Sequence, residues 1–263
     1  MPLTRPTLAA ASWVRRHGDR TRPAAVDGSA PARDASWYVP GDAGRAGLVP
    51  PGTPMTPRVL ALGDALRRGA PVSDAEFDQV FPDELRDRSV LHWTPVAVAL
   101  RAAVLLAPGT RGVRVLDVGA GVGKLCLVGA LVTGSMWWGI EQDALQVAAA
   151  NHAAWALDVS SRTRFVHGDG SRLPWDWFDA FYFYNPFSTV MLAPHASPFV
   201  RYATIQATLR RIEQRLAATP PGTRIVTFHG FGGRLPPQFR LAAREPAGDD
   251  ALELWIREPP PRA

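Results

Sequence analysis

An aspartate followed by three alternating glycines is the first group of residues whose types and spacing indicate chemistry. The apolar run VRVLDV contains Asp117 near its end, and Gly119, Gly121 and Gly123 follow. Glycine lets the backbone approach a ligand closely and take a positive φ, and the helix predicted directly after the loop favours an anion at its N-terminus. The segment therefore predicts a ligand-binding turn between a buried strand and a helix.

Two common nucleotide-binding loops do not fit this spacing. A phosphate-binding P-loop requires a glycine where Val118 stands and a hydroxyl residue where Leu125 stands. A dinucleotide fingerprint requires its third glycine at Lys124, whose long side chain would crowd the packing of helix against strand. These mismatches argue against a P-loop protein and against an oxidoreductase.

The elements that must position this loop alternate between strand and helix. The patterns predict strands over 113–118, 136–141, 163–168, 179–185 and 223–230, with helices over 122–132, 143–157 and 199–218. This alternation implies an α/β fold with a doubly wound, mostly parallel sheet covered on both faces, and 239–245 with 251–258 predict a closing antiparallel hairpin. Ligands of such sheets bind at the carboxyl ends of the strands, so the glycine loop is the expected site.

The segment LDVGAGVG closely resembles the first motif of the class I S-adenosylmethionine-dependent methyltransferases, an acidic residue followed by G-x-G-x-G. Glu141 ends the second predicted strand, Asp169 follows the third and Asn185 follows the fourth, which is where this family places its later motifs. The resemblance covers residues 90–258 and implies a seven-stranded, Rossmann-like sheet with S-adenosylmethionine as the cofactor.

The resemblance also implies roles on the cofactor side. Glu141 would accept hydrogen bonds from the ribose hydroxyls, Asp169 from the adenine amino group, and Asp117 would act near the methionine amino group. Thr94 lies in a segment similar to one that folds over the cofactor in related enzymes. Each has a structural alternative: Asp117 as a loop cap, Glu141 as a solvated strand end, Asp169 as a turn residue, and Thr94 as the N-cap of a helix that begins at Pro95.

On the acceptor side, Asn185, Pro186 and Phe187 resemble the N-P-P-[YF] motif of enzymes that methylate DNA bases or protein glutamine, with one proline missing. They are also similar to the N-x-F segment of histone-lysine methyltransferases that lack a SET domain. Either likeness implies a nitrogen acceptor. Tyr184 is the aromatic residue expected to line the acceptor pocket, and His229 is either a general base or a structural histidine.

Composition narrows the partners and the location. The net charge is +5, but Lys124 is the only lysine and no run of basic residues occurs, so a protein or small-molecule acceptor is favoured over nucleic acid. Lys124 is expected to be a solvated surface residue, and the single cysteine, Cys126, a small buried one that fits a reducing cytoplasm. No apolar run reaches the roughly 18 residues of a membrane span, and no metal site is expected.

The sequence before residue 90 divides in two. Residues 1–57 have the composition of an irregular or flexible segment, and 58–89 form a helical extension with helices over 59–69 and 73–81. Ser73 and Glu76 have the spacing of a capping box. Residues 90–258 form the predicted methyltransferase domain, which the extension is expected to cover near the acceptor pocket. Two functions remain as alternatives to a methyltransferase with a nitrogen acceptor in a protein. One is a small-molecule methyltransferase, and the other is a non-catalytic assembly module that binds the cofactor.

Overall fold

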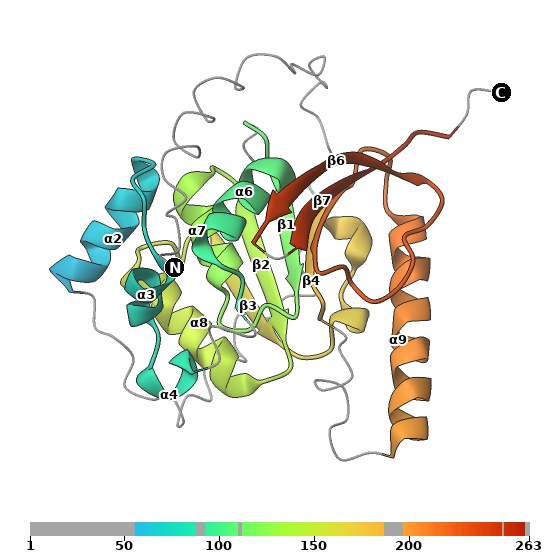
Figure 1. The fold of residues 1–263 in the computed structure, drawn as a ribbon, viewed down its shortest axis with the longest axis horizontal. Coiled ribbons are helices and arrows are strands. Elements are labelled where there is room, and N and C mark those ends of the chain that lie inside the picture. Colours follow the sequence, from blue (N-terminus) through green and yellow to red (C-terminus); the bar gives the residue numbers. More distant parts are fainter. Residues whose placement is uncertain (1–55, 88–92, 110–111, 187–196, 249, 261–263) are drawn as a thin grey trace, which may run out of the picture.

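A seven-stranded sheet lies at the centre of the computed structural model, which describes residues 56–87, 93–109, 112–186, 197–248 and 250–260 (Figure 1). The strand order is β3-β2-β1-β4-β5-β7-β6. Strands β1 to β5 run parallel to one another, and β7 pairs antiparallel with both β5 and β6. The strands are β1 Arg114–Val118, β2 Met136–Glu141, β3 Thr163–His167, β4 Ala180–Tyr184, β5 Arg224–Phe228, β6 Phe239–Ala247 and β7 Asp250–Arg257. This confirms the predicted fold class and the closing hairpin.

Helices cover both faces of the sheet because the strands are apolar on both sides. One face packs against α6 (Val96–Leu106), α7 (Lys124–Val132) and α8 (Ala144–Ala156). The other packs against α9 (Pro198–Ala218) and two short 3₁₀ turns, η3 (Gly170–Arg172) and η4 (Trp175–Trp177). No helix in the described ranges is long and apolar enough to cross a membrane.

Strand β4 shows how the sequence pattern is divided between the two faces. Tyr182 and Tyr184 contribute to the core beneath α6 to α8, whereas Phe181 and Phe183 contribute to the core beneath α9. The alternation of side chains along a strand requires this division. Trp175 and Phe178 are buried beside Phe181, so the aromatic cluster before β4 is core rather than a surface cage.

The helical extension packs on the α7 side of the molecule (Figure 1). It consists of α2 (Pro57–Arg67), α3 (Asp74–Phe77), η2 (Asp78–Val80) and α4 (Asp83–Arg86). Leu66, Phe77 and Phe81 are fully buried in the same hydrophobic core as α6, α7 and α8. The extension therefore shares its core with the helices that support the glycine loop.

The predicted capping box is confirmed, and the alternative of Thr94 as an N-cap is wrong. Ser73 and Glu76 form the capping box of α3, and the Asp143 side chain accepts from Leu145 N at the start of α8. Thr94 does not cap α6: the helix begins at Val96, and the carboxylate of Asp74 accepts from Val96 N at 2.8 Å instead. The hydrogen-bond acceptor at the start of α6 thus comes from a residue 22 positions away in the sequence, which local patterns do not indicate.

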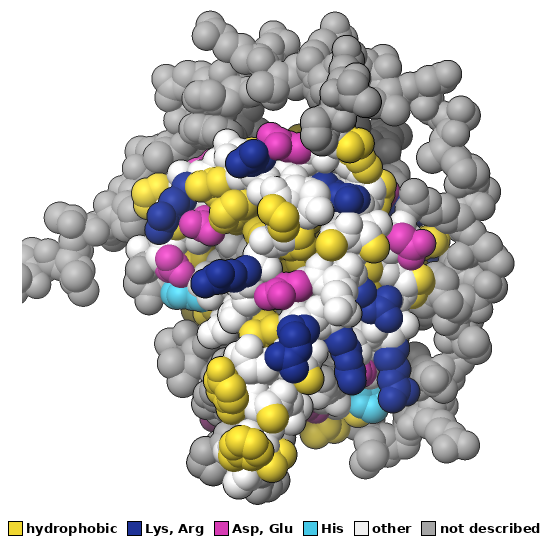
Figure 2. All heavy atoms as spheres, turned by 90° about the vertical axis from the view of Figure 1, so that its right-hand side faces the viewer, with side chains coloured by type: hydrophobic (Ala, Val, Ile, Leu, Met, Phe, Trp, Pro, Cys, Tyr) yellow, Lys and Arg dark blue, Asp and Glu magenta, His cyan; other side chains and the backbone are white. Residues whose placement is uncertain are grey.

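On the face that carries α9 and the closing hairpin, several Lys or Arg side chains lie among acidic, hydrophobic and uncharged ones (Figure 2). The exposed arginines of these elements include Arg210, Arg211, Arg240 and Arg244. At the start of α9, Phe199, Val200 and Tyr202 are exposed. Arg240 pairs with Glu258 and Arg244 with Glu253, so this face presents arginines together with acidic partners rather than a purely basic patch.

Candidate cofactor and acceptor site

The glycine loop joins β1 to α7 at the point where the strand order reverses, and its three glycines all have positive φ. Gly119 has φ of 79°, and a Cβ atom there would lie 2.8 Å from Cβ of Pro186. Gly123, the N-cap of α7, has φ of 75°, and a Cβ atom there would lie 2.2 Å from the ring of Phe165. The loop therefore needs glycine at both ends, and its first glycine touches the segment after β4.

Glu141 ends β2 and organises the loop through backbone hydrogen bonds. Its Oε2 accepts from Gly121 N at 2.9 Å, and its Oε1 accepts from Gln142 N at 2.7 Å and Asp143 N at 3.0 Å. The side chain is buried, which excludes the alternative of a solvated strand end. Each carboxylate oxygen can accept two hydrogen bonds, so Oε2 keeps the capacity to accept another donor.

Asp117 is a buried carboxyl group on β1, in register with Gly139 of β2 and Tyr182 of β4. Burial, reinforced by the nearby negative charge of Glu141, raises its pKa to about 8. The Cys126 thiol lies 3.9 Å from Oδ2 and donates to it, which acts weakly in the opposite direction. The carboxyl is therefore mainly protonated at neutral pH, and a cationic group brought beside it would favour its ionised form.

Asp169 follows β3 and caps the turn η3. Its Oδ1 accepts from Ser171 N and its Oδ2 from Ser171 Oγ, both at 2.8 Å. A Cβ atom on Gly170 would lie 3.3 Å from Ile140 and 3.4 Å from Val118. The turn thus packs directly on the ends of β1 and β2, and Asp169 serves as a turn residue at the same edge as the glycine loop.

Thr94 and Trp93 approach the loop from the segment before α6. The Thr94 hydroxyl lies 3.2 Å from the Tyr182 hydroxyl, both side chains are buried, and burial raises the pKa of Tyr182 well above its usual range. A Cβ atom on Gly121 would lie 3.9 Å from Cδ1 of Trp93. The segment predicted to fold over the cofactor therefore packs against the glycine loop.

On the acceptor side, Asn185 is an exposed residue with φ of 40°, and its backbone N–H donates to Gly230 O at 2.9 Å. Pro186 is buried against Gly119. This geometry joins the segment after β4 to the segment after β5 and to the glycine loop. Phe187 lies outside the described residues.

Tyr184 and His229 stack at the same edge, with ring centroids 5.4 Å apart and an interplanar angle of 24°. His229 has φ of 55°, and its Nδ1 lies 2.9 Å from Oδ2 of Asp250 at the start of β7. Sequence reasoning did not identify Asp250, because antiparallel pairing of β7 with β5 is what brings it to His229. Non-glycine residues with positive φ often occur at functional sites, and Asn185 and His229 both have it.

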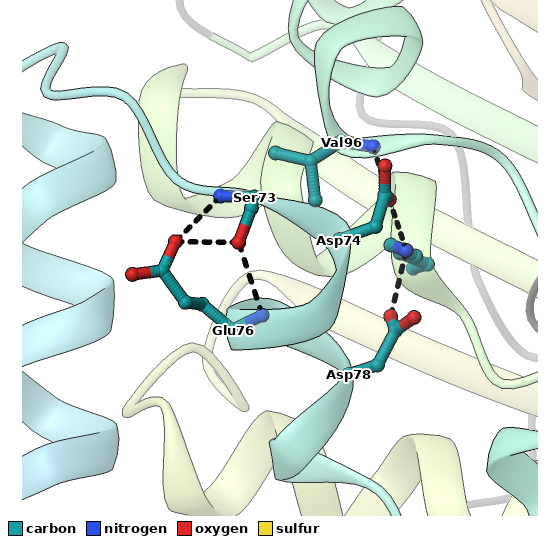
Figure 3. A network of polar contacts seen from close by, with 6 residues as sticks. Ser73, Asp74, Glu76, Asp78 and Val96 are labelled. Carbon is teal, nitrogen blue, oxygen red and sulfur yellow. Dashed lines mark hydrogen bonds and ion pairs between the residues drawn. The ribbon is translucent and has the colours of Figure 1, made fainter.

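The expectation that Lys124 is a solvated residue is wrong. Only 2% of its side chain is exposed, and its Nζ lies 2.5 Å from Oδ1 of Asp74 and 2.6 Å from Oδ1 of Asp78 (Figure 3). Both carboxylates belong to the helical extension. Cys126 is fully buried, as expected. Among the described residues, no group of three or more His, Cys, Asp or Glu side chains could hold a metal ion.

The chain matches known proteins over part of its length. No family model matches the chain. The release factor glutamine methyltransferase of Chlorobaculum tepidum is 39% identical over 113 residues, which are 41% of this chain and 35% of that enzyme, so the match spans about a third of the curated relative. Similar solved structures include TrmN from Thermus thermophilus, with a TM-score of 0.49 and 23% identity over 66% of this chain and 52% of that one. Another is an RNA methyltransferase from Salinibacter ruber in complex with S-adenosyl-L-homocysteine, with a TM-score of 0.44 and 20% identity over 60% and 90%. The sheet order and the glycine loop at its switch point are those expected of a class I methyltransferase fold, and the curated relative that matches 41% of the chain is a methyltransferase.

Proposed function

We propose that the chain is an S-adenosylmethionine-dependent methyltransferase that acts on a nitrogen atom. The observation that carries this proposal is the contact between the glycine loop and the segment after β4, where Pro186 packs on Gly119. In a class I fold these two segments hold the methyl donor and the methyl acceptor. Their direct contact is what transfer from one to the other requires.

The residues on the cofactor side fit S-adenosylmethionine. Glu141 keeps acceptor capacity on Oε2 for a ribose hydroxyl, and the N-terminus of α7 directly after Gly123 suits a carboxylate. Asp117, with its raised pKa, would take the ionised form opposite an ammonium group. Asp169 lies at the adenine end of the same edge. When bound, the cofactor supplies a methyl group on a sulfonium, which is already a good leaving group.

The acceptor side fits a nitrogen nucleophile. The amide oxygen of Asn185 can accept a hydrogen bond from an N–H group, and its exposure leaves it open to a substrate. His229 is a candidate to remove a proton from an amine, because an imidazole that donates Nδ1–H to Asp250 presents an acceptor at Nε2. The curated relative is named for a glutamine acceptor, whose side-chain amide is such a nitrogen. Protein glutamine or lysine is therefore our first choice of acceptor.

Two other functions lead to different measurements. A small-molecule methyltransferase would label a metabolite fraction, and a non-catalytic assembly module would bind the cofactor without turnover. RNA belongs in the acceptor screen as well, because exposed arginines such as Arg210 and Arg211 of α9 could contact phosphates.

The test begins with calorimetric titration of the purified chain with S-adenosylmethionine, S-adenosylhomocysteine and NAD. We expect saturable binding of the first two and none of NAD. A methyl-label screen of glutamine and lysine peptides, RNA and metabolites then identifies the acceptor class.

The matched variant for this screen is Asn185→Ala, which should lose turnover and retain cofactor affinity, because in the proposed arrangement Asn185 would contact the acceptor and not the cofactor. Full activity in this variant would remove Asn185 from the mechanism. Failure of the wild-type protein to bind either sulfonium or thioether ligand would refute the proposed function.

A further inference from the structure

Lys124 is a buried cation held between two carboxylates at the start of the helix that follows the glycine loop. Its ammonium lies 2.5 Å from Asp74 and 2.6 Å from Asp78, and 6.0 Å from the ring centroid of Phe77. A buried lysine is costly unless its charge is paired and hydrogen-bonded. The pairing therefore explains how a lysine can occupy a fully packed position at Gly123–Lys124.

The two carboxylates face Lys124 because of the way α3 begins. The Ser73 hydroxyl and the Glu76 carboxylate cap the helix reciprocally, with Ser73 N donating to Oε2 of Glu76 at 2.8 Å (Figure 3). This cap sets Asp74 as the first helical residue. Asp78 follows four residues later, on the same side of the turn.

Asp74 connects three segments. Its Oδ1 accepts from Val96 N at the start of α6 and from Lys124 Nζ at the start of α7 (Figure 3). The residue Trp93, just before α6, packs on the loop at Gly121 and stacks edge-on against Phe81 of the extension. One carboxylate thus joins the extension to both segments that border the glycine loop.

Trp93 adds an independent sign that this junction faces a ligand. Its side chain is 4% exposed, and its indole N–H has no hydrogen-bond partner in the part of the chain that the structure describes. The ring atom nearest Gly121 is Cδ1, which is bonded to that nitrogen. A buried donor without a partner is costly, and here it lies beside the loop.

We propose that Lys124, Asp74 and Asp78 are positioning residues that hold the glycine loop and the segment 93–96 in the arrangement that receives the cofactor. The inference rests on the proposed function for the identity of that ligand. The ion pairs link the extension to the glycine loop. Packing of the extension and binding of the ligand at the loop should therefore strengthen one another. The extension is then part of the cofactor site and not only a cover for the acceptor.

The single lysine of the chain provides a direct reporter of this junction. Wild-type protein, without added ligand, is pulsed with an amine-reactive acetylating reagent, and modification of Lys124 is measured by mass spectrometry against the α-amino group. We expect Lys124 in the folded protein to be labelled at least about tenfold more slowly than the same lysine in the urea-unfolded protein. Added S-adenosylhomocysteine should slow the labelling further.

The variants are Asp78→Asn and Lys124→Met, with Glu245→Gln as the matched control. Glu245 pairs with Arg101 between β6 and α6, away from the loop. Asp78→Asn should speed the labelling of Lys124, and both site variants should weaken S-adenosylhomocysteine affinity by about tenfold or more. They should also speed amide exchange at Gly121 and Gly123, and the control should change none of these quantities.

Lys124→Met alone leaves the buried carboxylate of Asp78 without its cation and could unfold the protein. The double variant Lys124→Met with Asp78→Leu removes both buried charges. We expect it to be folded, with amide exchange at the loop still faster than in the wild type. Rapid labelling of wild-type Lys124, or unchanged loop exchange in the folded variants, would overturn the proposal. Neither readout needs a ligand, so a wild-type protein that fails to bind S-adenosylhomocysteine would refute only the proposed function.

Discussion

The raised pKa of Asp117 makes the stability of the protein depend on pH in a direction opposite to that of most carboxylates. The folded protein holds this proton up to pH about 8, whereas in the unfolded chain the group has a pKa of 3.8. Between these values the folded state binds more protons than the unfolded state. The free energy of unfolding therefore falls as pH rises through the window from about 4 to 8.

The magnitude follows from the same two pKa values. Each pH unit inside the window costs about 1.4 kcal/mol of stability, so over the roughly 3 units between the unfolded pKa and pH 7 ionisable Asp117 costs roughly 4 kcal/mol. Asp117→Asn keeps the shape of the side chain and cannot ionise. We expect this variant to be more stable than the wild type at pH 7 by a few kcal/mol, and the difference to shrink towards zero near pH 4.

The assay is urea unfolding of both proteins at pH 5, 6, 7 and 8, followed by fluorescence of the tryptophans. Asp179→Asn is the control. Asp179 is a more exposed carboxylate, and it pairs with Arg114 at the amino ends of the strands, away from the glycine loop. The control should not reproduce the pH-dependent gain. If wild type and Asp117→Asn show parallel curves over this range, the carboxyl is not protonated in the folded protein and the reasoning fails. The same variant should bind the cofactor more weakly. That result would show that the stability lost by burying the Asp117 carboxyl serves cofactor binding.

Three further predictions concern the loop and the acceptor side. Glu141→Ala should weaken S-adenosylhomocysteine binding more than about tenfold in calorimetry, because it removes the proposed ribose acceptor and the bond to the loop; unchanged affinity would exclude the ribose role. Gly119→Ala should lower the free energy of unfolding by about 1–3 kcal/mol, measured in urea, because the new methyl group would meet Pro186 at positive φ; wild-type stability would mean that the contact yields easily. His229→Asn should lower kcat by about 10²-fold or more, with cofactor affinity retained; an unaltered kcat would make the pair with Asp250 structural.

Local patterns in the sequence are sufficient to predict the sheet and the strand ends at which the candidate site lies. Alternating and continuous apolar runs predict the strands, and the glycines predict a loop with positive φ, because both patterns express local backbone preferences. Glu141, Asp169 and Asn185 could be placed together without a structure, since parallel strands end at the same edge.

The partners of the buried polar side chains, in contrast, depend on how distant segments pack. Lys124 pairs with a carboxylate 50 residues away, and Thr94 bonds to a tyrosine 88 residues away instead of capping its own helix. His229 meets Asp250 only because β7 inserts between β5 and β6. A charged or polar side chain is stable in the interior when a partner satisfies it. That partner is supplied by the packing of distant segments, which local sequence patterns do not specify.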